Sequence, residues 1–177
     1  GTRIWVSGDA CLDRLALRCA DKGLQGLNMT SGIPGTVGGA VVGNAGAFGR
    51  QVGDVLTKVE LVDREGNVYE KSRDELGFSY RESALKESGE IVLSCVFDLE
   101  AGSCEALLKE RSEILTLRKA KHPDLSKEPC AGSIFKNIEP TSEAERRQAA
   151  GWFLELCGAK QFRVGGACIY EKHANII

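Results

Sequence analysis

The chain has 177 residues, which is enough for one domain or two small ones. Its 42% apolar and 27% charged residues are typical of a globular protein and exclude a disordered chain or a coiled coil. The formal net charge of -2 argues against nucleic acid or a membrane surface as a partner, because both usually require a concentrated basic face. Apolar stretches such as residues 91–93 are far too short to span a bilayer.

The cysteines and histidines indicate neither a metal site nor a disulfide framework. The seven cysteines are odd in number and include no Cys-x-x-Cys pair. His122 and His173 have no second histidine or carboxylate at metal-ligand spacing, so we expect both to be structural or exposed. Unpaired thiols fit a reducing compartment, and we expect a cytoplasmic protein without a bound metal.

The N-terminal region predicts a strand followed by a helix. Residues 3–7 are expected to form the strand, and Asp9 is the expected N-cap of the helix. The helix carries one apolar face and is expected to end at Gly23.

The middle of the chain predicts a hairpin, a further strand and a helix. The hairpin is expected at residues 55–62 and 68–71, which flank a polar loop, and the further strand at 90–99. Residues 107–119 carry apolar residues among charges, so we expect a surface helix with one buried stripe.

The composition changes near residues 125–129, and we place a domain boundary there, with one domain at 1–124 and a second at 125–177. In the second domain, Ser142 and Glu145 form an expected capping box.

A helix with an apolar face is expected to follow that box, at residues 149–156. Two strands are expected near the C-terminal end, at 162–170 and 174–177.

The most distinctive segment is rich in glycine. Seven of the 19 residues from Ser31 to Gly49 are glycines, and most of the others are small. Without Cβ atoms the backbone can approach a flat or phosphorylated ligand closely and offer its N–H groups to anionic oxygens. The same glycines are also typical of tight turns around a closely packed short helix, and glycine content alone favours that structural interpretation.

Two further short segments carry reactive side chains. Arg81 follows Tyr80 in a loop-like stretch, and a guanidinium is well suited to bind a carboxylate. Ser133 follows a glycine at the start of an extended stretch, and its hydroxyl is a candidate proton donor. Taken singly, a solvated surface arginine and a serine bonded to its own turn are the commoner outcomes.

Four motifs stand in order along the chain. They are Gly32-Ile33-Pro34-Gly35-Thr36-Val37-Gly38-Gly39-Ala40 with Asn44-Ala45-Gly46-Ala47-Phe48-Gly49, then Tyr80-Arg81-Glu82-Ser83, then Ala131-Gly132-Ser133-Ile134-Phe135-Lys136-Asn137, and finally Gly165-Gly166-Ala167 with Lys172-His173-Ala174-Asn175. In this order they resemble the UDP-N-acetylenolpyruvoylglucosamine reductase family. The first motif is highly specific and the last is weak alone.

The resemblance implies an α+β architecture. Part of a vanillyl-alcohol-oxidase-type (PCMH-type) FAD-binding domain would precede part of a small α+β substrate-binding domain. It also implies a monomeric flavoenzyme that uses NADPH and FAD to reduce the enolpyruvyl ether of UDP-N-acetylglucosamine to UDP-N-acetylmuramate for peptidoglycan. In that chemistry Arg81 would stabilise the enolate charge and Ser133 would protonate the adjacent carbon.

The resemblance further assigns binding residues. For FAD they are Gly8, Ser31, Gly32, Ile33, Pro34, Gly35, Thr36, Gly38, Gly39, Ala40 and Asn44. For the substrate they are Tyr80, Lys121, Lys136 and Asn137, and Lys121 is alternatively placed near the nicotinamide cofactor.

Two parts of the family pattern have no counterpart in this sequence. They are an earlier glycine-rich loop for the FAD pyrophosphate and a glutamate beyond the last motif. We therefore expect the chain to be a truncated relative that binds FAD weakly. Two other interpretations stay open, namely a catalytically inactive relative that binds a nucleotide-sugar or a protein, and another FAD oxidoreductase of the same superfamily.

Overall fold

The computed structural model describes residues 1–140 and 147–177. Their backbone forms two compact units, Gly1–Leu115 and Thr116–Ile177, which are described one at a time. Helices and antiparallel strands occur together in the chain, so the expected α+β class is confirmed. The domain division expected after residue 124 stays a prediction.

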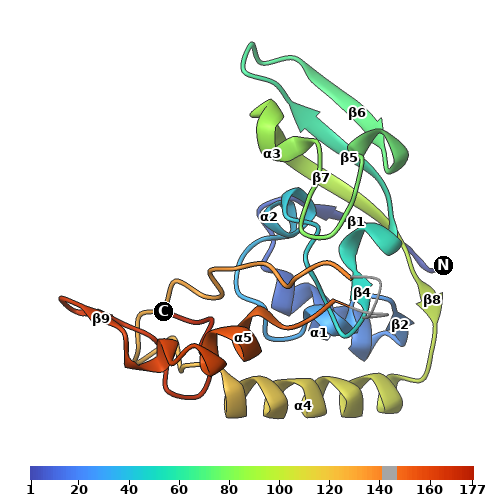
Figure 1. The fold of residues 1–177 in the computed structure, drawn as a ribbon. Coiled ribbons are helices and arrows are strands. Elements are labelled where there is room, and N and C mark those ends of the chain that lie inside the picture. The colour runs from blue at the N-terminus through green and yellow to red at the C-terminus, as the bar shows by residue number, and fades with distance from the viewer. Residues whose placement is uncertain (141–146) are drawn as a thin grey trace. The chain divides into compact units, whose positions relative to one another are not determined.

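The first unit is built on a four-stranded antiparallel sheet (Figure 1). In spatial order the strands are β1 (Arg3–Ser7), β7 (Ile91–Asp98), β5 (Leu56–Val62) and β6 (Val68–Ser72). All four strands were expected from the sequence, and their ends are confirmed to within one residue. Irregular pairing between β5 and β7 at residues 60–61 marks a bulge.

One face of this sheet supplies the core of the first unit. Leu61, Cys95 and Phe97 are fully buried on that face. Residues that alternate with them face outward, as Lys58 does, where its Nζ forms an ion pair of 2.7 Å with Glu70. This alternation of buried and outward side chains is the period-two pattern of a half-buried strand.

Helix α1 (Leu12–Asp21) packs its apolar face into this core. The N-cap is Cys11, so the prediction of Asp9 as the cap is wrong. Asp9 instead accepts a 2.5 Å hydrogen bond from the Ser7 hydroxyl. The N–H of Leu12 donates to the carbonyl of Gly35, so a loop carbonyl takes over part of the capping role.

Helix α4 (Cys104–Lys121) begins after β7 and a two-residue strand, and it carries the expected buried stripe. Leu107 and Ile114 lie on the stripe, and Arg111 lies between them. Arg111 forms a bidentate ion pair with Asp13 of α1, with N–O distances of 2.7 and 2.9 Å. A buried arginine therefore needs and finds a carboxylate partner, a contact that the apolar periodicity did not predict.

Shorter elements complete the first unit. They are the paired strands β2 (Leu24–Gln25) and β8 (Glu100–Ala101), the paired strands β3 (Gly46–Ala47) and β4 (Arg50–Gln51), the helices α2 (Val37–Val42) and α3 (Leu85–Ser88), and the 3-10 turns η1 (Asn28–Thr30), η2 (Val52–Asp54) and η3 (Asp74–Leu76).

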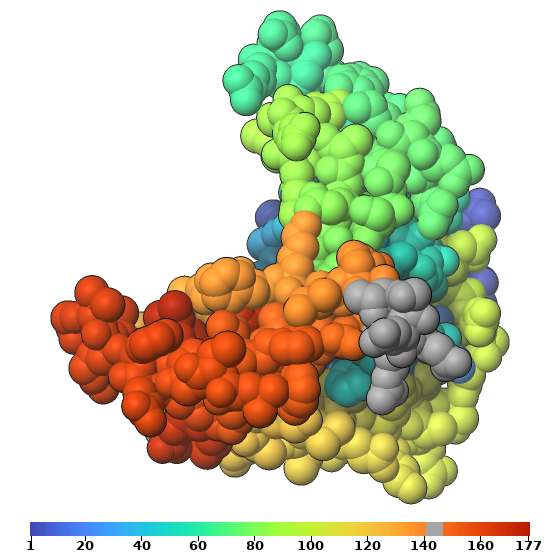
Figure 2. All heavy atoms as spheres, in the orientation of Figure 1, coloured from blue at the N-terminus to red at the C-terminus, as the bar shows by residue number. Residues whose placement is uncertain are grey.

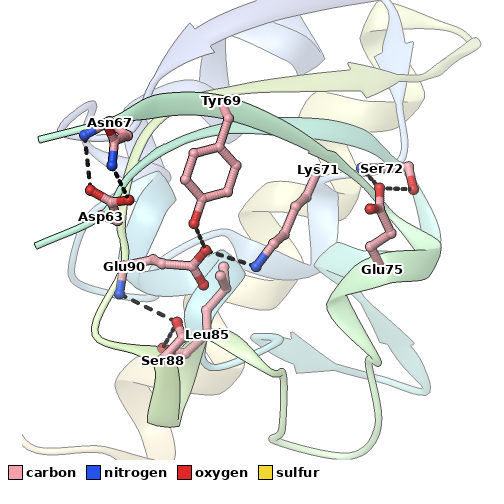
Figure 3. Close-up of polar contacts among 9 residues, drawn as sticks. All are labelled: Asp63, Asn67, Tyr69, Lys71, Ser72, Glu75, Leu85, Ser88 and Glu90. Atoms are coloured by element: carbon pink, nitrogen blue, oxygen red, sulfur yellow. Dashed lines mark hydrogen bonds and ion pairs between the residues drawn. The ribbon is translucent and has the colours of Figure 1, made fainter. Parts of the chain in front are cut away.

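The β5–β6 hairpin ends in a loop that forms the tip of the first unit at the top of the space-filling view (Figure 2). Below the loop, Glu90 accepts hydrogen bonds from the Tyr69 hydroxyl and from Lys71 Nζ, the latter at 2.7 Å (Figure 3). The Glu90 side chain is only 6% exposed. Its bonds, that to Lys71 above all, lower its pKa to about 2, and the bond to Glu90 is the main cause that raises the pKa of Tyr69 to about 12.

The second unit holds the C-terminal end of α4, then α5 (Ala150–Leu156), η4 (Ala159–Gln161), β9 (Arg163–Val164) and β10 (Ala167–Cys168). The predicted helix is confirmed as α5, whereas the capping box predicted at Ser142 and Glu145 lies outside the described residues.

The strand predicted at residues 162–170 is instead the short β9–β10 hairpin, because two glycines turn the chain in the middle of the apolar pattern. Residues 174–177 form no strand and contribute only an isolated bridge at Ile176, so that prediction is wrong. Their burial accounts for the apolar pattern, since Ala174 and Ile176 are 1% exposed.

Two absences concern only residues 1–140 and 147–177. None of their helices combines the length and apolarity needed to cross a bilayer. Nor do they bring together three or more His, Cys, Asp or Glu side chains in a position to hold a metal ion.

Candidate functional site

The glycine-rich segment lies against the loop that follows β1. The N–H of Gly38 donates to the carbonyl of Gly8 at 2.8 Å, and the N–H of Val37 donates to the carbonyl of Ala10 at 2.9 Å. Gly8 is close-packed, since a Cβ there would stand 2.1 Å from the carbonyl oxygen of Val92. A Cβ on Gly38 would approach the Gly8 oxygen to 3.1 Å, so backbone packing requires glycine at position 8 and leaves little space at position 38.

Other glycines of the same segment have open space around them. Gly35 has φ +121°, and nothing lies within 4 Å of the position that a Cβ would take. Pro34, Thr36 and Gly39 are exposed beside it, and the Thr36 hydroxyl accepts a bond from the Gly39 N–H at 3.2 Å. These four residues form an exposed rim whose backbone is bare at Gly35 and Gly39, and a side chain on Gly35 would occupy the open space beside it. Such a rim fits a flat, phosphorylated cofactor such as FAD.

The remaining residues of the expected FAD set support this rim from beneath. Ser31 and Ala40 are buried, and Gly32 and Ile33 are half-buried. The N–H of Gly32 donates to Asp13 at 2.6 Å, so this loop is tied to α1.

Asn44 differs from the other expected FAD residues because it is completely buried. Its Nδ2 donates to Gln51 Oε1 at 2.9 Å and to the carbonyl of Ser79 at 2.8 Å. Its Oδ1 accepts from the N–H of Gly53 at 3.0 Å. The amide is therefore bonded within the protein at both ends, and its backbone is left-handed with φ +42°.

Arg81 lies in a tight turn next to this asparagine. Ser79 and Glu82 exchange backbone hydrogen bonds of 3.2 and 3.1 Å, which places Tyr80 and Arg81 at the tip of the turn. Arg81 has φ +59°, an uncommon conformation for a residue other than glycine. Its Nη2 donates to the carbonyl of Gly46 at 2.6 Å, and its guanidinium lies 5.2 Å from the Tyr80 ring centre. The structure thus brings the arginine motif onto the end of the glycine-rich motif.

In the second unit, Ser133 is exposed on an extended stretch that follows Gly132. This stretch pairs with the end of the chain, through a bridge between Ser133 and Ile176 and a bond from the N–H of Ala131 to the carbonyl of Ile177 at 2.6 Å. Within the described residues, the Ser133 hydroxyl makes no bond to its own turn.

Asn175 fixes the residues that follow Ser133. Its Oδ1 accepts from the N–H of Phe135 at 2.9 Å, and its Nδ2 donates to the carbonyl of Phe135 at 2.8 Å. Asn175 is 4% exposed. Sequence analysis did not assign a function to it, although it ends the last of the four motifs.

The other expected substrate residues of the second unit are spread along its surface. Lys121 is exposed at the end of α4, and Lys136 is exposed after Phe135. Asn137 accepts a 3.2 Å bond from the N–H of Ala150 at the start of α5, which is a helix-capping contact.

Beside Lys121, the rings of His122 and His173 lie with their centres 6.1 Å apart. Burial is the main cause that lowers the pKa of His122, and the charges of Arg118, His173 and Lys121 lower it further.

Comparison with known proteins agrees with this organisation. A family model for an FAD binding domain matches residues 1–72, and the model for the C-terminal domain of UDP-N-acetylenolpyruvoylglucosamine reductase matches residues 123–177.

Curated relatives match the whole chain. The UDP-N-acetylenolpyruvoylglucosamine reductase of Caldicellulosiruptor bescii is 40% identical over 100% of this chain and 54% of its own length. The Bacillus subtilis enzyme of the same name is 37% identical over 100% of this chain and 56% of its own length.

A solved structure matches as well. The crystal structure of the UDP-N-acetylenolpyruvylglucosamine reductase from Thermus caldophilus superposes with a TM-score of 0.83 at 35% identity, over 98% of this chain and 60% of that one. Along its whole length the chain is therefore similar to the UDP-N-acetylenolpyruvoylglucosamine reductases, and it spans about half the length of the curated relatives it matches.

Proposed function

We propose that this chain carries the FAD-binding rim and two of the acting residues of a cytoplasmic flavoenzyme that reduces the enolpyruvyl ether of UDP-N-acetylglucosamine with NADPH. The observation that carries this proposal is the bond between Arg81 Nη2 and the carbonyl of Gly46. It joins the loop that bears a substrate-binding cation to the glycine-rich segment that offers a backbone cradle. A reductase needs its substrate next to its flavin, and this contact brings the two binding elements together within one unit.

The residues present fit FAD. The exposed backbone of Pro34, Gly35, Thr36 and Gly39 would hold it, on a layer fixed by Gly8 and Gly38. Bound FAD would supply hydride transfer from NADPH to the enolpyruvyl double bond. The chain's own contribution is to place the cofactor and to exclude side chains from the rim.

Arg81 would bind the substrate carboxylate and stabilise the negative charge that develops beside it during reduction. A guanidinium held by a carbonyl on one nitrogen still presents its other donors in a fixed plane. Its fixed position matters because preorganised charges contribute most to stabilising a transition state. Tyr80, at 5.2 Å from the guanidinium, would restrict its orientation.

Ser133 would deliver the proton to the carbon next to the carboxylate. Its hydroxyl is exposed and lies on a backbone fixed by pairing with Ile176. The remaining substrate contacts are assigned to Lys121 and Lys136, whose ammonium groups suit phosphate oxygens, and to Asn137.

The cradle is tested by a pair of matched glycine substitutions. Gly35 and Gly66 both have positive φ, at +121° and +89°, and neither has an atom within 4 Å of its Cβ position. Gly66 lies in the β5–β6 loop, away from the glycine-rich segment. Alanine at either site introduces similar backbone strain. We expect Gly35→Ala alone to weaken FAD binding, by about tenfold or more, which corresponds to about 1.4 kcal/mol.

Titration of each variant with FAD by fluorescence quenching, with a melting curve for each, measures this difference. Equal FAD affinity in both variants would show that the rim does not bind the cofactor. Flavin reduction by NADPH and reoxidation by the enolpyruvyl substrate, followed by stopped flow, then test the reaction itself. If the chain binds FAD but its reduced flavin is not reoxidised by that substrate, the result would favour the interpretation that the chain is a catalytically inactive relative.

A further inference from the structure

Each of the two residues proposed to act on the substrate lies on a loop that a buried asparagine holds from another motif. Asn44 holds the turn of Arg81 through the Ser79 carbonyl, and Asn175 holds the stretch of Ser133 through both polar groups of Phe135. The first pair is 35 residues apart in sequence and the second is 40. Neither asparagine is more than 4% exposed.

The Asn44 contact bears directly on the conformation of Arg81. The Ser79 carbonyl accepts from Asn44 and also from the N–H of Glu82, which closes the turn. That turn keeps Arg81 at φ +59°, where a side chain costs conformational energy unless its surroundings enforce it. The contact at Ser79 fixes the backbone two residues before Arg81, and the bond to Gly46 fixes the Arg81 side chain itself.

The Asn175 side chain pairs with the backbone of Phe135 in the way that a neighbouring strand would. Its amide reproduces the donor and acceptor of a neighbouring backbone and satisfies both groups of Phe135. The backbone carbonyl of Asn175 also accepts from the N–H of Ile134 at 3.0 Å. Three bonds from one residue therefore fix the two positions that follow Ser133.

We propose that Asn44 and Asn175 are positioning residues, which act through Arg81 and Ser133 and not by contact with FAD or substrate. The inference rests on the proposed function, because it takes Arg81 and Ser133 as the acting groups. It revises the role expected for Asn44, which was assigned to FAD by resemblance. A completely buried amide with three protein bonds has no donor or acceptor turned to a cofactor in this arrangement.

Aspartate is the informative substitution because it changes one atom of the amide. In Asn44→Asp the acceptor for Gly53 is retained, but at neutral pH the donor to Ser79 is replaced by a carboxylate oxygen that repels that carbonyl. Gln51 can rotate its side-chain amide so that its NH2 group donates to the new carboxylate, whereas the Ser79 carbonyl can only accept a hydrogen bond. The bond to Ser79 is therefore lost selectively, and protonation of the introduced carboxyl at lower pH restores a donor.

Hydrogen exchange of the Ser79 and Glu82 amides tests the Asn44 arm without any turnover. We expect Asn44→Asp to speed their exchange by about tenfold or more at neutral pH, with partial recovery as the pH is lowered. Asn28→Asp is the matched control, since Asn28 is 3% exposed and bridges Gly26 to Glu110 in the same unit. It should lower the melting temperature without a selective effect on Ser79 and Glu82. Unchanged exchange of these amides in Asn44→Asp would overturn the proposal.

Flavin measurements separate positioning from cofactor contact. In Asn44→Asp we expect unchanged FAD affinity and normal flavin reduction by NADPH. Reoxidation of the flavin by the substrate should be slow at neutral pH and should approach the wild-type rate as the pH is lowered. A loss of FAD affinity with normal exchange at Ser79 would make Asn44 a cofactor ligand instead. If the wild-type chain shows no reoxidation, the proposed function fails, whereas the exchange result still decides the role of Asn44.

A double-mutant cycle tests the Asn175 arm. Asn175→Asp should open the Phe135 amide to exchange and slow reoxidation in a chain that keeps Ser133. In a Ser133→Ala background the same substitution should slow reoxidation no further, because its effect passes through the missing hydroxyl. Equal slowing in both backgrounds would show that Asn175 acts on stability or on another group, and would overturn this arm.

Discussion

At the scale of single residues, the site combines exposed reactive groups with buried groups that bind only protein. Ser133 is exposed, whereas Asn175 beside it is buried and fully bonded. A serine hydroxyl is a weak acid, and no histidine or lysine is placed by the described contacts to activate it. In the proposed reaction, proton donation by Ser133 would therefore depend on the strong basicity of the carbanion that hydride transfer produces.

Substitution of Ser133 separates the proton donor from the hydride steps. We expect Ser133→Ala to leave flavin reduction by NADPH intact and to slow reoxidation by the substrate by orders of magnitude. Ser133→Cys should recover much of the rate, since a thiol of similar reach has a pKa of about 8.5 and is the stronger acid. Stopped-flow traces and a melting curve on the same variants measure both effects. A normal reoxidation rate in Ser133→Ala would remove Ser133 from the mechanism.

At the scale of elements, short sequence patterns predicted the helices and strands whose formation depends on residues close together in the chain. The β5–β6 hairpin follows from alternation and a polar loop, and α4 from the spacing of Leu107 and Ile114. Residues 174–177 were predicted as a strand because three of the four are apolar, but residues 174–176 are buried without a continuous partner strand and Ile177 is exposed. Burial and strand pairing are distinct, and a short apolar run without a turn and a partner run indicates only burial.

Contacts between distant segments were not predictable in the same way. Nothing near Asn44 in the sequence indicates that its amide binds a carbonyl 35 residues away. The four motifs contain both loops and both asparagines, whereas the contacts that join each asparagine to its loop are seen only in the folded chain.

The cluster around Glu90 makes the hairpin sensitive to acid. Folding lowers the pKa of Glu90 from 4.5 to about 2, chiefly through the bond from Lys71, so the folded state binds its proton more weakly than the unfolded state does. Its stabilising contribution is complete above pH 4.5 and is lost as the pH falls toward 2. Glu90→Gln should therefore destabilise the chain at pH 7 and lose this disadvantage toward pH 2.

Urea unfolding at a series of pH values measures that convergence. Glu70→Gln is the control, because Glu70 pairs with Lys58 while both side chains stay more than 40% exposed. Exposed pairs of this kind contribute little to stability. Parallel stability curves for wild type and Glu90→Gln across the acid range would show that the Glu90 cluster carries no net stabilisation.

At the scale of the whole molecule, the two units differ in what they bury. The hydrophobic cluster of buried residues, from Leu12 to Leu99, belongs to the first unit. In the second unit, large apolar side chains such as Trp152, Leu156 and Phe162 are 59–67% exposed. Stability should therefore be unequal between the units, with cooperative unfolding concentrated in the first.

The reactivity of the cysteines can be used to measure this difference in stability between the two units. All seven are free, but only Cys19 and Cys95 are buried, and both lie in the first unit. Burial raises the pKa of their thiols to about 11 and about 12, which suppresses the reactive thiolate. In the native chain we therefore expect a disulfide reagent to label the exposed Cys11, Cys104, Cys157 and Cys168 rapidly and the half-buried Cys130 more slowly.

Cys19 and Cys95 should become labelled together, only as the first unit unfolds. Labelling in increasing urea, with peptide mapping by mass spectrometry, gives the site and the rate for each thiol. The two should share one unfolding midpoint, since both belong to one packed core and a cooperative unit opens as a whole. Labelling of Cys95 at low urea while Cys19 stays protected would instead mean that β7 leaves the sheet before α1 leaves the core, and that the first unit is not one cooperative structure.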